Sequence, residues 1–470
     1  MTRGSGPYAL GVDLGVSGAR AAVVGLDGTV AGSGLVARPG RPGSGLGPHD
    51  PRQWVTDVLA AARAALAEAA VARVEAIAVA ALGPAPVLVD DNLRPLAPAC
   101  LLSLDPRLEQ QRTLLLDTLG LEAADVPPGH PVPQLMWWRE DAPAAWQRAS
   151  MVLDATGFLV SALTGVPTMD TVTALDYSLP GLPCPVPCPK ALDPSAIAGG
   201  LAKGPAADLG LPAGTPVAVG SYDSYIDLAR MGTREPGDAC ILLGSTQVVG
   251  QVADAAAVLP ADSVLRRTPH LGAGHLIGGW TSAAGLTLDW CDEVLAFGLE
   301  DTWGAVADIR PGTGGLLALP YLAGERAPVW DALARGAIVG LTARTSRLEI
   351  CRAVLDGVAL STRDLTERLR QILPPPAEWR AGGGGVRNRV WLQATADAVG
   401  SPLAVIDEPD GVAAAAHAFA AIAAAPMKPP ETSLVTPDES QTRRYRSLYE
   451  PYRGLYGGLA AAMHVLAHLD

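Results

Sequence analysis

The sequence lacks the features that mark nucleic-acid-binding and membrane proteins. It has 35 Lys and Arg against 48 Asp and Glu, a formal net charge of −13 at pH 7. Because nucleic-acid binding relies on clustered Lys and Arg, we expect no nucleic-acid partner. No charge-free apolar run is long enough for a bilayer, and the first apolar run meets Asp13 within a few residues. We therefore expect no membrane partner and a cytoplasmic protein.

Cysteine is also scarce, and the six cysteines are scattered along the chain. Such scatter fits reduced thiols. Cys184 and Cys188 form a CPVPC loop, but no nearby His or second Cys pair completes a metal site. The sequence therefore disfavours metal binding at this loop.

Phenylalanine is nearly absent, with three residues, yet 49% of the chain is hydrophobic and only 18% is charged. This composition predicts compact globular structure. A chain of 470 residues is too long for one core and suits two large domains. The acidity does not exclude a nucleotide, because the phosphates of a small ligand need only local positive groups.

The most informative stretch is YALGVDLGVSGARAAVVGLDGTV, residues 8–30, which predicts a β-hairpin with a glycine-bearing turn. Asp13 ends an apolar strand, where a carboxylate faces a metal, a charged partner or an opening. An ordinary hairpin with a solvated Asp is the alternative. The turn carries groups suited to an anion, namely Gly15, Ser17, Gly18 and Arg20.

A second stretch repeats this design at residues 237–253, GDACILLGSTQVVGQVA. Two apolar strands flank the small polar turn Gly244-Ser245-Thr246. Two such hairpins, more than two hundred residues apart, predict two related halves that face each other across a nucleotide.

Between and after the hairpins, strands and helices alternate, which predicts α/β structure with a mixed sheet. We expect a helix over residues 52–72, a buried strand over 74–82, and helices over 134–163. A strand over 215–219 precedes Asp223, where a general base would lie; a lone Asp there would equally cap the next helix.

The last region, residues 441–469, predicts a helix that Pro451 kinks or splits. Tyr445, Tyr449, Tyr452 and Tyr456 recur at helical spacing. This stripe predicts a packing face against a domain or against the second subunit of a homodimer.

Together these motifs resemble the FGGY family of carbohydrate kinases, within the actin-like ATPase superfamily. DLGVSGAR is similar to the family's first phosphate loop, GSYDSYIDLARMG to its catalytic-Asp segment and GST to its second phosphate loop. The run GAIVGLTARTSRLEICRAVLD, residues 336–356, is similar to its C-terminal signature, and PYLAGERAPVWDALARG and GGGGVRNRVW add two matches. The resemblance extends from residue 8 to about residue 424.

The resemblance implies an α/β fold with two ribonuclease H-like domains, mixed sheets flanked by helices, and an active-site cleft between the domains. We place the N-terminal domain at 1–232, the nucleotide-binding domain at 233–425 and a C-terminal helical segment that packs on the domains at 426–470. Glu325 and Arg326, in the GER motif, are interpreted as structural.

The resemblance also implies ATP-dependent phosphoryl transfer, with Mg²⁺, to a hydroxyl of a small sugar or polyol. Asp223 would accept the hydroxyl proton, and Asp13 and Asp223 would serve the metal, in part through water. The implied nucleotide contacts are Gly15, Ser17, Gly244, Ser245, Thr246, Gly285, Asp289, Gly383, Gly384, Gly385 and Asn388. The implied acceptor contacts are Ser17, Gly18, Arg20, Asp105, Asp223 and Ser224.

Three departures from the family pattern bear on the acceptor. Val16 stands where the family usually has Thr, and Ser103 where it usually has Trp. Leu82-Gly83-Pro84 replaces the Gln, Met and His of xylulose kinases, so these side chains cannot bind sugar hydroxyls. The residues SGAR in the first phosphate loop, together with GST in the second, most resemble the corresponding motifs of kinases that act on D-ribulose and similar ketopentoses. We expect D-ribulose or D-xylulose, with an arabinitol-like polyol as the alternative.

Two other classes compete with a sugar kinase. Val16 and the apolar Leu82-Gly83-Pro84 would suit a degenerate member that binds nucleotide or sugar without transfer, whereas the intact Asp13 and Asp223 argue against it. An actin-like filament or chaperone ATPase is disfavoured because those proteins lack the Asp223 segment and the C-terminal signature.

Overall fold

The chain forms two compact units, each with its own sheet and core. The computed structural model describes residues 7–38, 48–100, 106–121, 125–126, 129–179, 181–260, 263–295, 301–422, 427–467 and 469. Unit 1 contains the described residues up to Arg230 and the segment Glu408–Pro430. Unit 2 contains Met231–Asp407 and Glu431–Asp470.

The expected second domain, residues 233–425, does not coincide with unit 2 in one segment. Glu408–Pro430, most of which lies within those bounds, packs in unit 1. The physical reason is that the Ala-rich helix α12 (Val412–Ala421) buries Ala415, Ala418 and Phe419 against the unit 1 sheet. The chain therefore returns to its first core before it completes the second.

Unit 1 contains a seven-stranded mixed sheet with the strand order β11-β12-β5-β1-β2-β3, and β13 pairs with β5. The predicted hairpin is confirmed as β1 and β2, which pair antiparallel. β1 and β12 run parallel to β5. The strands of this sheet are β1 (Tyr8–Gly15), β2 (Gly18–Gly25), β3 (Val30–Ala37), β5 (Ala76–Ala81), β11 (Ile197–Gly200), β12 (Pro216–Ala218) and β13 (Ser221–Tyr222).

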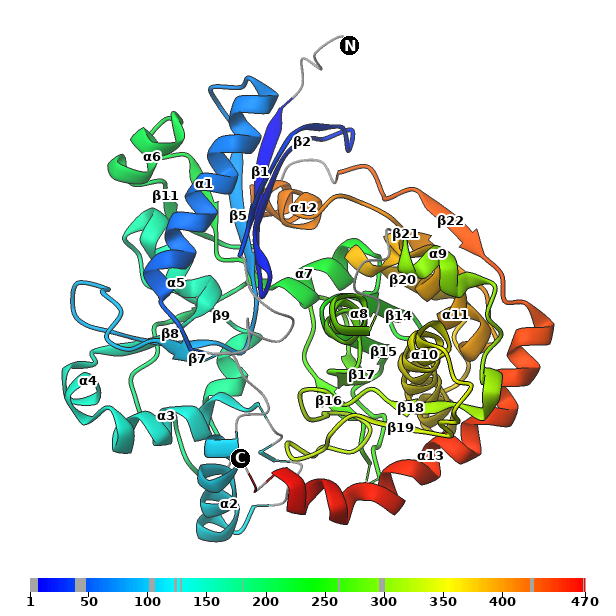
Figure 1. Cartoon of the computed structure of the whole chain (residues 1–470). Helices are drawn as coiled ribbons and strands as arrows, with labels where there is room; N and C mark the ends of the chain where they lie inside the picture. The colour runs from blue at the N-terminus through cyan, green and yellow to red at the C-terminus, as the bar shows by residue number, and fades with distance from the viewer. Residues whose placement is uncertain are drawn as a thin grey trace. The chain divides into compact units, whose positions relative to one another are not determined.

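Two helices cover opposite faces of this sheet (Figure 1). Side chains alternate along a strand, so Leu10 faces the core beneath α1 (Pro51–Ala69), while Ala9 faces α12. Helix α1 begins where the Asp50 side chain accepts a hydrogen bond from the Arg52 N–H at 2.9 Å. The sequence predicted this helix over 52–72, close to its observed bounds.

The rest of unit 1 consists of short strands and helices outside this sheet. The stretch 134–163, predicted as helices, also contains strand β8 (Met151–Asp154), which pairs with β6 (Pro86–Val89), so that part of the prediction is wrong. The apolar run MVL before Asp154 is short and buried, and such a run fits a strand or a helix equally well. These elements are β4 (Pro48–His49), β6 (Pro86–Val89), β7 (Ala99–Cys100), α2 (Pro106–Leu119), α3 (Pro131–Asp141), α4 (Pro143–Arg148), β8 (Met151–Asp154), α5 (Ala155–Thr164), β9 (Met169–Asp170), β10 (Ala191–Leu192), α6 (Lys203–Leu209) and α7 (Asp223–Arg230).

Unit 2 repeats the sheet plan of unit 1. Its seven strands have the order β16-β17-β15-β14-β20-β21-β22, with antiparallel β17, β15 and β14 followed by parallel β20 and β21. The predicted relationship between two halves is therefore visible in the strand order. The strands are β14 (Ala239–Leu243), β15 (Gln247–Ala253), β16 (Arg266–Thr268), β17 (His275–Thr281), β20 (Trp379–Gly382), β21 (Leu403–Ile406) and β22 (Thr432–Val435).

Long helices build the core of unit 2. Helix α10 (Arg347–Ile372) begins with a capping box between Ser346 and Glu349 and is buried along most of its length. The remaining elements are α8 (Gly285–Trp290), α9 (Thr302–Ala307), β18 (Leu317–Leu319), β19 (Ala337–Val339), α10 (Arg347–Ile372), α11 (Arg389–Val399) and α13 (Glu439–Ala467). None of the described helices is long and apolar enough to cross a membrane.

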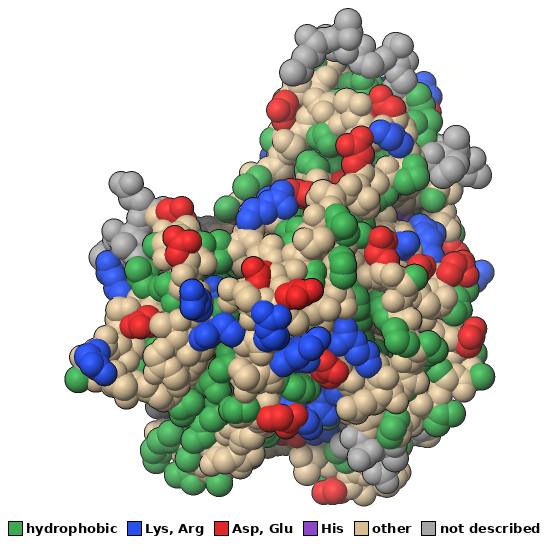
Figure 2. Space-filling model, turned by 90° about the vertical axis from the view of Figure 1, so that its right-hand side faces the viewer, with side chains coloured by type: hydrophobic (Ala, Val, Ile, Leu, Met, Phe, Trp, Pro, Cys, Tyr) green, Lys and Arg blue, Asp and Glu red, His purple; other side chains and the backbone are tan. Residues whose placement is uncertain are grey.

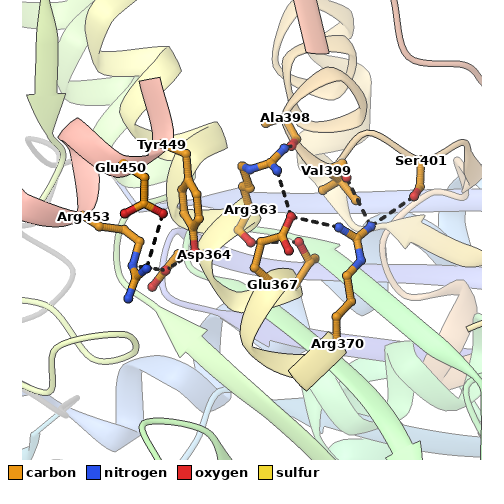
Figure 3. A network of polar contacts seen from close by, with 11 residues as sticks. Arg363, Asp364, Glu367, Arg370, Ala398, Val399, Ser401, Tyr449, Glu450 and Arg453 are labelled. Carbon is orange, nitrogen blue, oxygen red and sulfur yellow. Dashed lines mark hydrogen bonds and ion pairs between the residues drawn. The ribbon is translucent and has the colours of Figure 1, made fainter. Parts of the chain in front are cut away.

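The C-terminal helix α13 packs on unit 2 through the predicted tyrosine stripe. Tyr445 and Tyr452 are fully buried, and Tyr449 donates a hydrogen bond to Asp364 of α10 at 2.6 Å (Figure 3). Arg453 also lies 3.6 Å from Asp364. Helix α13 is continuous through Pro451, so the expected split does not occur.

Charge is unevenly spread over the surface. Lys and Arg side chains gather in a band on the face drawn in Figure 2, with Asp and Glu side chains among them. The acidic excess of the whole chain therefore does not produce a uniformly negative surface.

Candidate functional site

Strand β5 brings together in unit 1 the predicted catalytic residue, Asp223, and the predicted metal residue Asp13. Asp13 lies opposite Ala80 in the parallel pair β1–β5, and Ser221 lies opposite Ala80 in the parallel pair β13–β5. Asp223, the first residue of α7, follows β13 directly. Since the carboxyl ends of parallel strands meet at one edge of a sheet, the two aspartates share that edge.

Burial and neighbouring charges shift the pKa values of both carboxylates. Burial, together with the negative charge of Asp223, raises the pKa of Asp13 to about 7. Burial also raises the pKa of Asp223, although the Ser224 N–H, which donates to Asp223 at 2.6 Å, and the charge of Arg20 lower it. A raised pKa is not required for the transfer itself, because the acceptor proton is lost late in a loose transition state.

Two further carboxylates at this site were missed by sequence reasoning. Burial and the charges of Asp13 and Asp223 raise the pKa of Asp227 well above its ordinary value. Asp410, two residues before the start of α12, lies 2.9 Å from Arg20. The spacing of Asp223 and Asp227, one helical turn, was a usable signal; Asp410 offered none, because its segment was assigned to the other domain.

Arg20 lies over the first glycine turn. Its register position is opposite Asp13, and its Nη1 lies 3.7 Å from the Asp13 carboxylate. Its Nη2 donates to the Ser17 hydroxyl at 2.7 Å. Arg38 supports the turn from another side, with contacts of 3.3 and 3.4 Å to the carbonyl oxygens of Gly15 and Val16. The turn is thus held by two guanidinium groups.

The Tyr222 ring packs against Gly83, one of the residues at which this sequence differs from the xylulose kinase pattern. A Cβ on Gly83 would lie 1.9 Å from the Tyr222 ring, so this ring fills the space beside residue 83. The Tyr222 hydroxyl donates at 3.4 Å to Asp154, which also accepts from Tyr177 at 2.6 Å. The residue before Asp223 is therefore anchored to buried carboxylates.

Asp154 gives a prediction for pH. It is 1% exposed, and burial raises its pKa to about 7. Because the folded state holds this proton more tightly, the group stabilises the fold below about pH 4, and that contribution is lost as the pH rises to about 7. Between these values, the unfolding free energy of the wild type should fall by on the order of 3 kcal/mol more than that of Asp154→Asn. Denaturant titrations of both proteins across this pH range test the prediction. The same pH dependence of the unfolding free energy in the wild type and in Asp154→Asn would contradict it.

In unit 2, the second predicted phosphate turn adjoins the start of α8. The Gly244 N–H donates to the Thr246 carbonyl at 3.0 Å, which closes the turn. The N–H groups of Gly285 and Leu286 donate to the carbonyls of Gly244 and Ser245 at 3.1 and 3.0 Å. The structure therefore brings Gly285 to the turn; Asp289, one turn further along α8, is exposed.

The glycine run reaches the same sheet edge. Leu242 of β14 lies opposite Gly382 of β20, and a Cβ on Gly383 would lie 2.6 Å from the Leu243 carbonyl oxygen. Gly383 has a φ of 87°, a conformation that favours glycine. A short 3-10 turn over Gly384–Arg387 follows, so the run is a structured connection and not a long irregular loop. Asn388 caps α11, its side chain accepting from the Trp391 N–H at 3.0 Å.

Glu325 is structural, as expected. It is fully buried and accepts hydrogen bonds from the N–H groups of Ser282 and Ala283 at 2.7 and 3.2 Å. The Thr281 hydroxyl donates to the same carboxylate at 2.9 Å. Glu325 therefore fixes the connection that leads from β17 to Gly285.

The remaining predicted acceptor residues divide into two groups. Gly18 lies in the turn beside Ser17, and Ser224 follows Asp223 on α7, so both adjoin the aspartate cluster. Asp105 and Ser103 lie outside the described residues.

Comparisons with known proteins find similarity to carbohydrate kinases along nearly the whole chain. The N-terminal and C-terminal domain models of the FGGY family of carbohydrate kinases match residues 8–179 and 240–424. The xylulose kinase of Escherichia coli (strain K12) is 28% identical over 97% of this chain and 99% of the relative. The xylulose kinase of Staphylococcus xylosus is 24% identical over 96% of this chain and 99% of the relative. The crystal structure of xylulose kinase from Rhodospirillum rubrum has a TM-score of 0.78 at 26% identity, covering 97% of this chain and 100% of that chain.

Proposed function

Since the chain belongs to the FGGY family of carbohydrate kinases, which are ATP-using sugar phosphotransferases, we propose that it phosphorylates a ketopentose, with D-xylulose as the leading acceptor. The curated relatives that support this choice are named xylulose kinases and match this chain over nearly their full length. The observation that carries the proposal in the structure is the pairing of Asp13 with Asp223 at one sheet edge.

Asp223 acts as the general base in this proposal. Its carboxylate is oriented by the Ser224 N–H at 2.6 Å, so one oxygen stays available for the acceptor hydroxyl. Burial raises its pKa, which makes it a better proton acceptor near neutral pH. The proton leaves the hydroxyl as the new O–P bond forms and the bond from the γ-phosphorus to ADP breaks.

Asp13 and Asp223 are suited to a hydrated Mg²⁺. The Asp13 side chain is 19% exposed and shares its edge with a second carboxylate. No group of three or more His, Cys, Asp or Glu among the described residues is arranged to hold a metal. Mg²⁺ takes one or two carboxylates and completes its shell with water and phosphate oxygens. When bound, Mg²⁺ would spread the charge of the transferring phosphoryl group.

The nucleotide contacts are proposed on the two glycine turns. Gly15 and Ser17 in unit 1, and Gly244, Ser245 and Thr246 in unit 2, offer N–H and hydroxyl donors for phosphates. Gly285, with Asp289 one turn further on, would lie near the ribose or a phosphate. The adenine side would lie on Gly383, Gly384, Gly385 and Asn388. Arg20, Ser17, Gly18 and Ser224 remain the proposed acceptor contacts, together with Asp105.

A substrate panel tests this proposal. Purified protein with ATP and Mg²⁺ should form ADP fastest with D-xylulose, and more slowly with D-ribulose, D-arabinitol and glycerol. A preference for the polyols would replace the ketopentose with a polyol acceptor. Silence across the panel with ATP binding retained would favour a binding protein without transfer, which the apolar Leu82-Gly83-Pro84 would suit.

A further inference from the structure

Arg20 makes three contacts that together fix the plane of its guanidinium. Nε contacts Asp410 at 2.9 Å, Nη1 lies 3.7 Å from Asp13, and Nη2 donates to Ser17 at 2.7 Å. A Cβ on Gly15 would lie 2.8 Å from Nη1, so the group lies directly against the first glycine turn. Because the guanidinium is planar, the direction of Nε–H sets where the two Nη groups point.

The Nε partner comes from a segment far along the chain that unit 1 holds firmly. Glu408 forms a bidentate pair with Arg230 at 2.8 and 2.5 Å, and Arg230 also donates to the Lys428 carbonyl at 2.8 Å. Gly411, next to Asp410, packs so closely that an added Cβ would lie 2.9 Å from the Ala22 nitrogen. The Asp410 backbone is therefore anchored on both sides.

We propose that Asp410 is a positioning residue, which holds Arg20 through Nε so that the two Nη groups serve Asp13 and the phosphate-turn residue Ser17. The inference rests on the proposed function of these two residues. Asp410 itself needs no contact with ATP or sugar. Without its carboxylate, the Arg20 side chain keeps its charge but loses the contact that sets the guanidinium plane.

An ordinary surface ion pair would behave differently. Arg20 and Asp410 side chains are 26% and 32% exposed, so a purely structural pair would contribute little to stability and nothing to ligand affinity. A positioning role instead predicts an effect on ATP that passes entirely through Arg20. The two readings are thus separable by mutational coupling.

The test measures Mg·ATP binding by titration calorimetry, and steady-state KM and kcat with the preferred sugar. Asp410→Ala, which removes the acceptor for Nε–H, should weaken Mg·ATP binding and raise its KM about tenfold. Because Arg20 and Ser17 are also proposed acceptor contacts, the sugar KM should rise as well. Arg20→Lys, which keeps the charge but lacks the planar guanidinium, should resemble it. In an Arg20→Gln background, adding Asp410→Ala should have no further effect on Mg·ATP binding. The matched control Glu109→Ala removes the 2.6 Å pair with Arg112 on α2 and should leave binding unchanged.

Additive losses in the double variant would overturn the proposal, as would an Asp410→Ala protein with wild-type Mg·ATP affinity. If the wild type bound Mg·ATP but phosphorylated no sugar, the proposed function would fail. The calorimetric cycle would still decide the role of Asp410, because it needs no acceptor.

Discussion

Replacing Asp223 with Asn should lower kcat for sugar phosphorylation by about 10²- to 10⁴-fold, the usual contribution of a general base. The Asn side-chain oxygen can still accept the Ser224 N–H that orients Asp223 at 2.6 Å, so the geometry should persist while the proton acceptor is lost. Steady-state kinetics at saturating ATP and sugar measure this loss, and calorimetry should find ATP still bound.

The control for this variant is Asp208→Asn, which makes the same chemical change at an exposed position on α6. It should keep kcat within about twofold, as surface substitutions usually do. An Asp223→Asn enzyme with near-wild-type kcat would remove Asp223 from the chemistry and leave its cap-like contact with Ser224 as its only role.

Gly11→Ala should destabilise unit 1 by at least about 3 kcal/mol, at the upper end of the cost of overpacking. Its Cβ would lie 2.0 Å from the Gly411 carbonyl oxygen and 2.3 Å from the Ala415 nitrogen, both backbone atoms. Strand β1 and helix α12 would have to separate, which would displace Asp13 and Asp410 from each other. Thermal unfolding and residual kinase activity should therefore fall together.

Gly454→Ala is the matched substitution on helix α13. A Cβ at Gly454 would meet nothing within 4 Å, and Ala favours a helix over Gly by up to about 1 kcal/mol. This variant should be neutral or slightly more stable. Equal melting temperatures for Gly11→Ala and the wild type would show that the approach of β1 to α12 is not close.

Local sequence signals predicted much of the fold. Alternating apolar residues and glycine turns located the β1–β2 and β14–β15 hairpins, and periodicity located α1 and the tyrosine stripe of α13. The return of Glu408–Pro430 to unit 1 was missed because it depends on tertiary packing of an Ala-rich helix. An Ala-rich amphipathic segment fits many apolar surfaces, so its partner cannot be chosen from its own residues.

The sequence predicted those parts of the candidate site that lie within a recognisable local motif. Asp13, the first glycine turn and Asp223 were found from strand-end positions, and the structure places them at one sheet edge. Asp410 and the Tyr222 ring beside Gly83 were missed. Both depend on contacts between segments that are distant in sequence, which no local pattern records.

The central claim is direct transfer of a phosphoryl group from ATP to a sugar hydroxyl in this protein. The most direct measurement follows ATP labelled in its γ-phosphate, with D-xylulose and Mg²⁺, and separates the products. The account predicts that the label appears in a sugar phosphate, one for each ADP formed, and that Asp223→Asn slows formation of this product by about 10²- to 10⁴-fold. Label found only in inorganic phosphate, or ADP formation independent of the sugar, would contradict it.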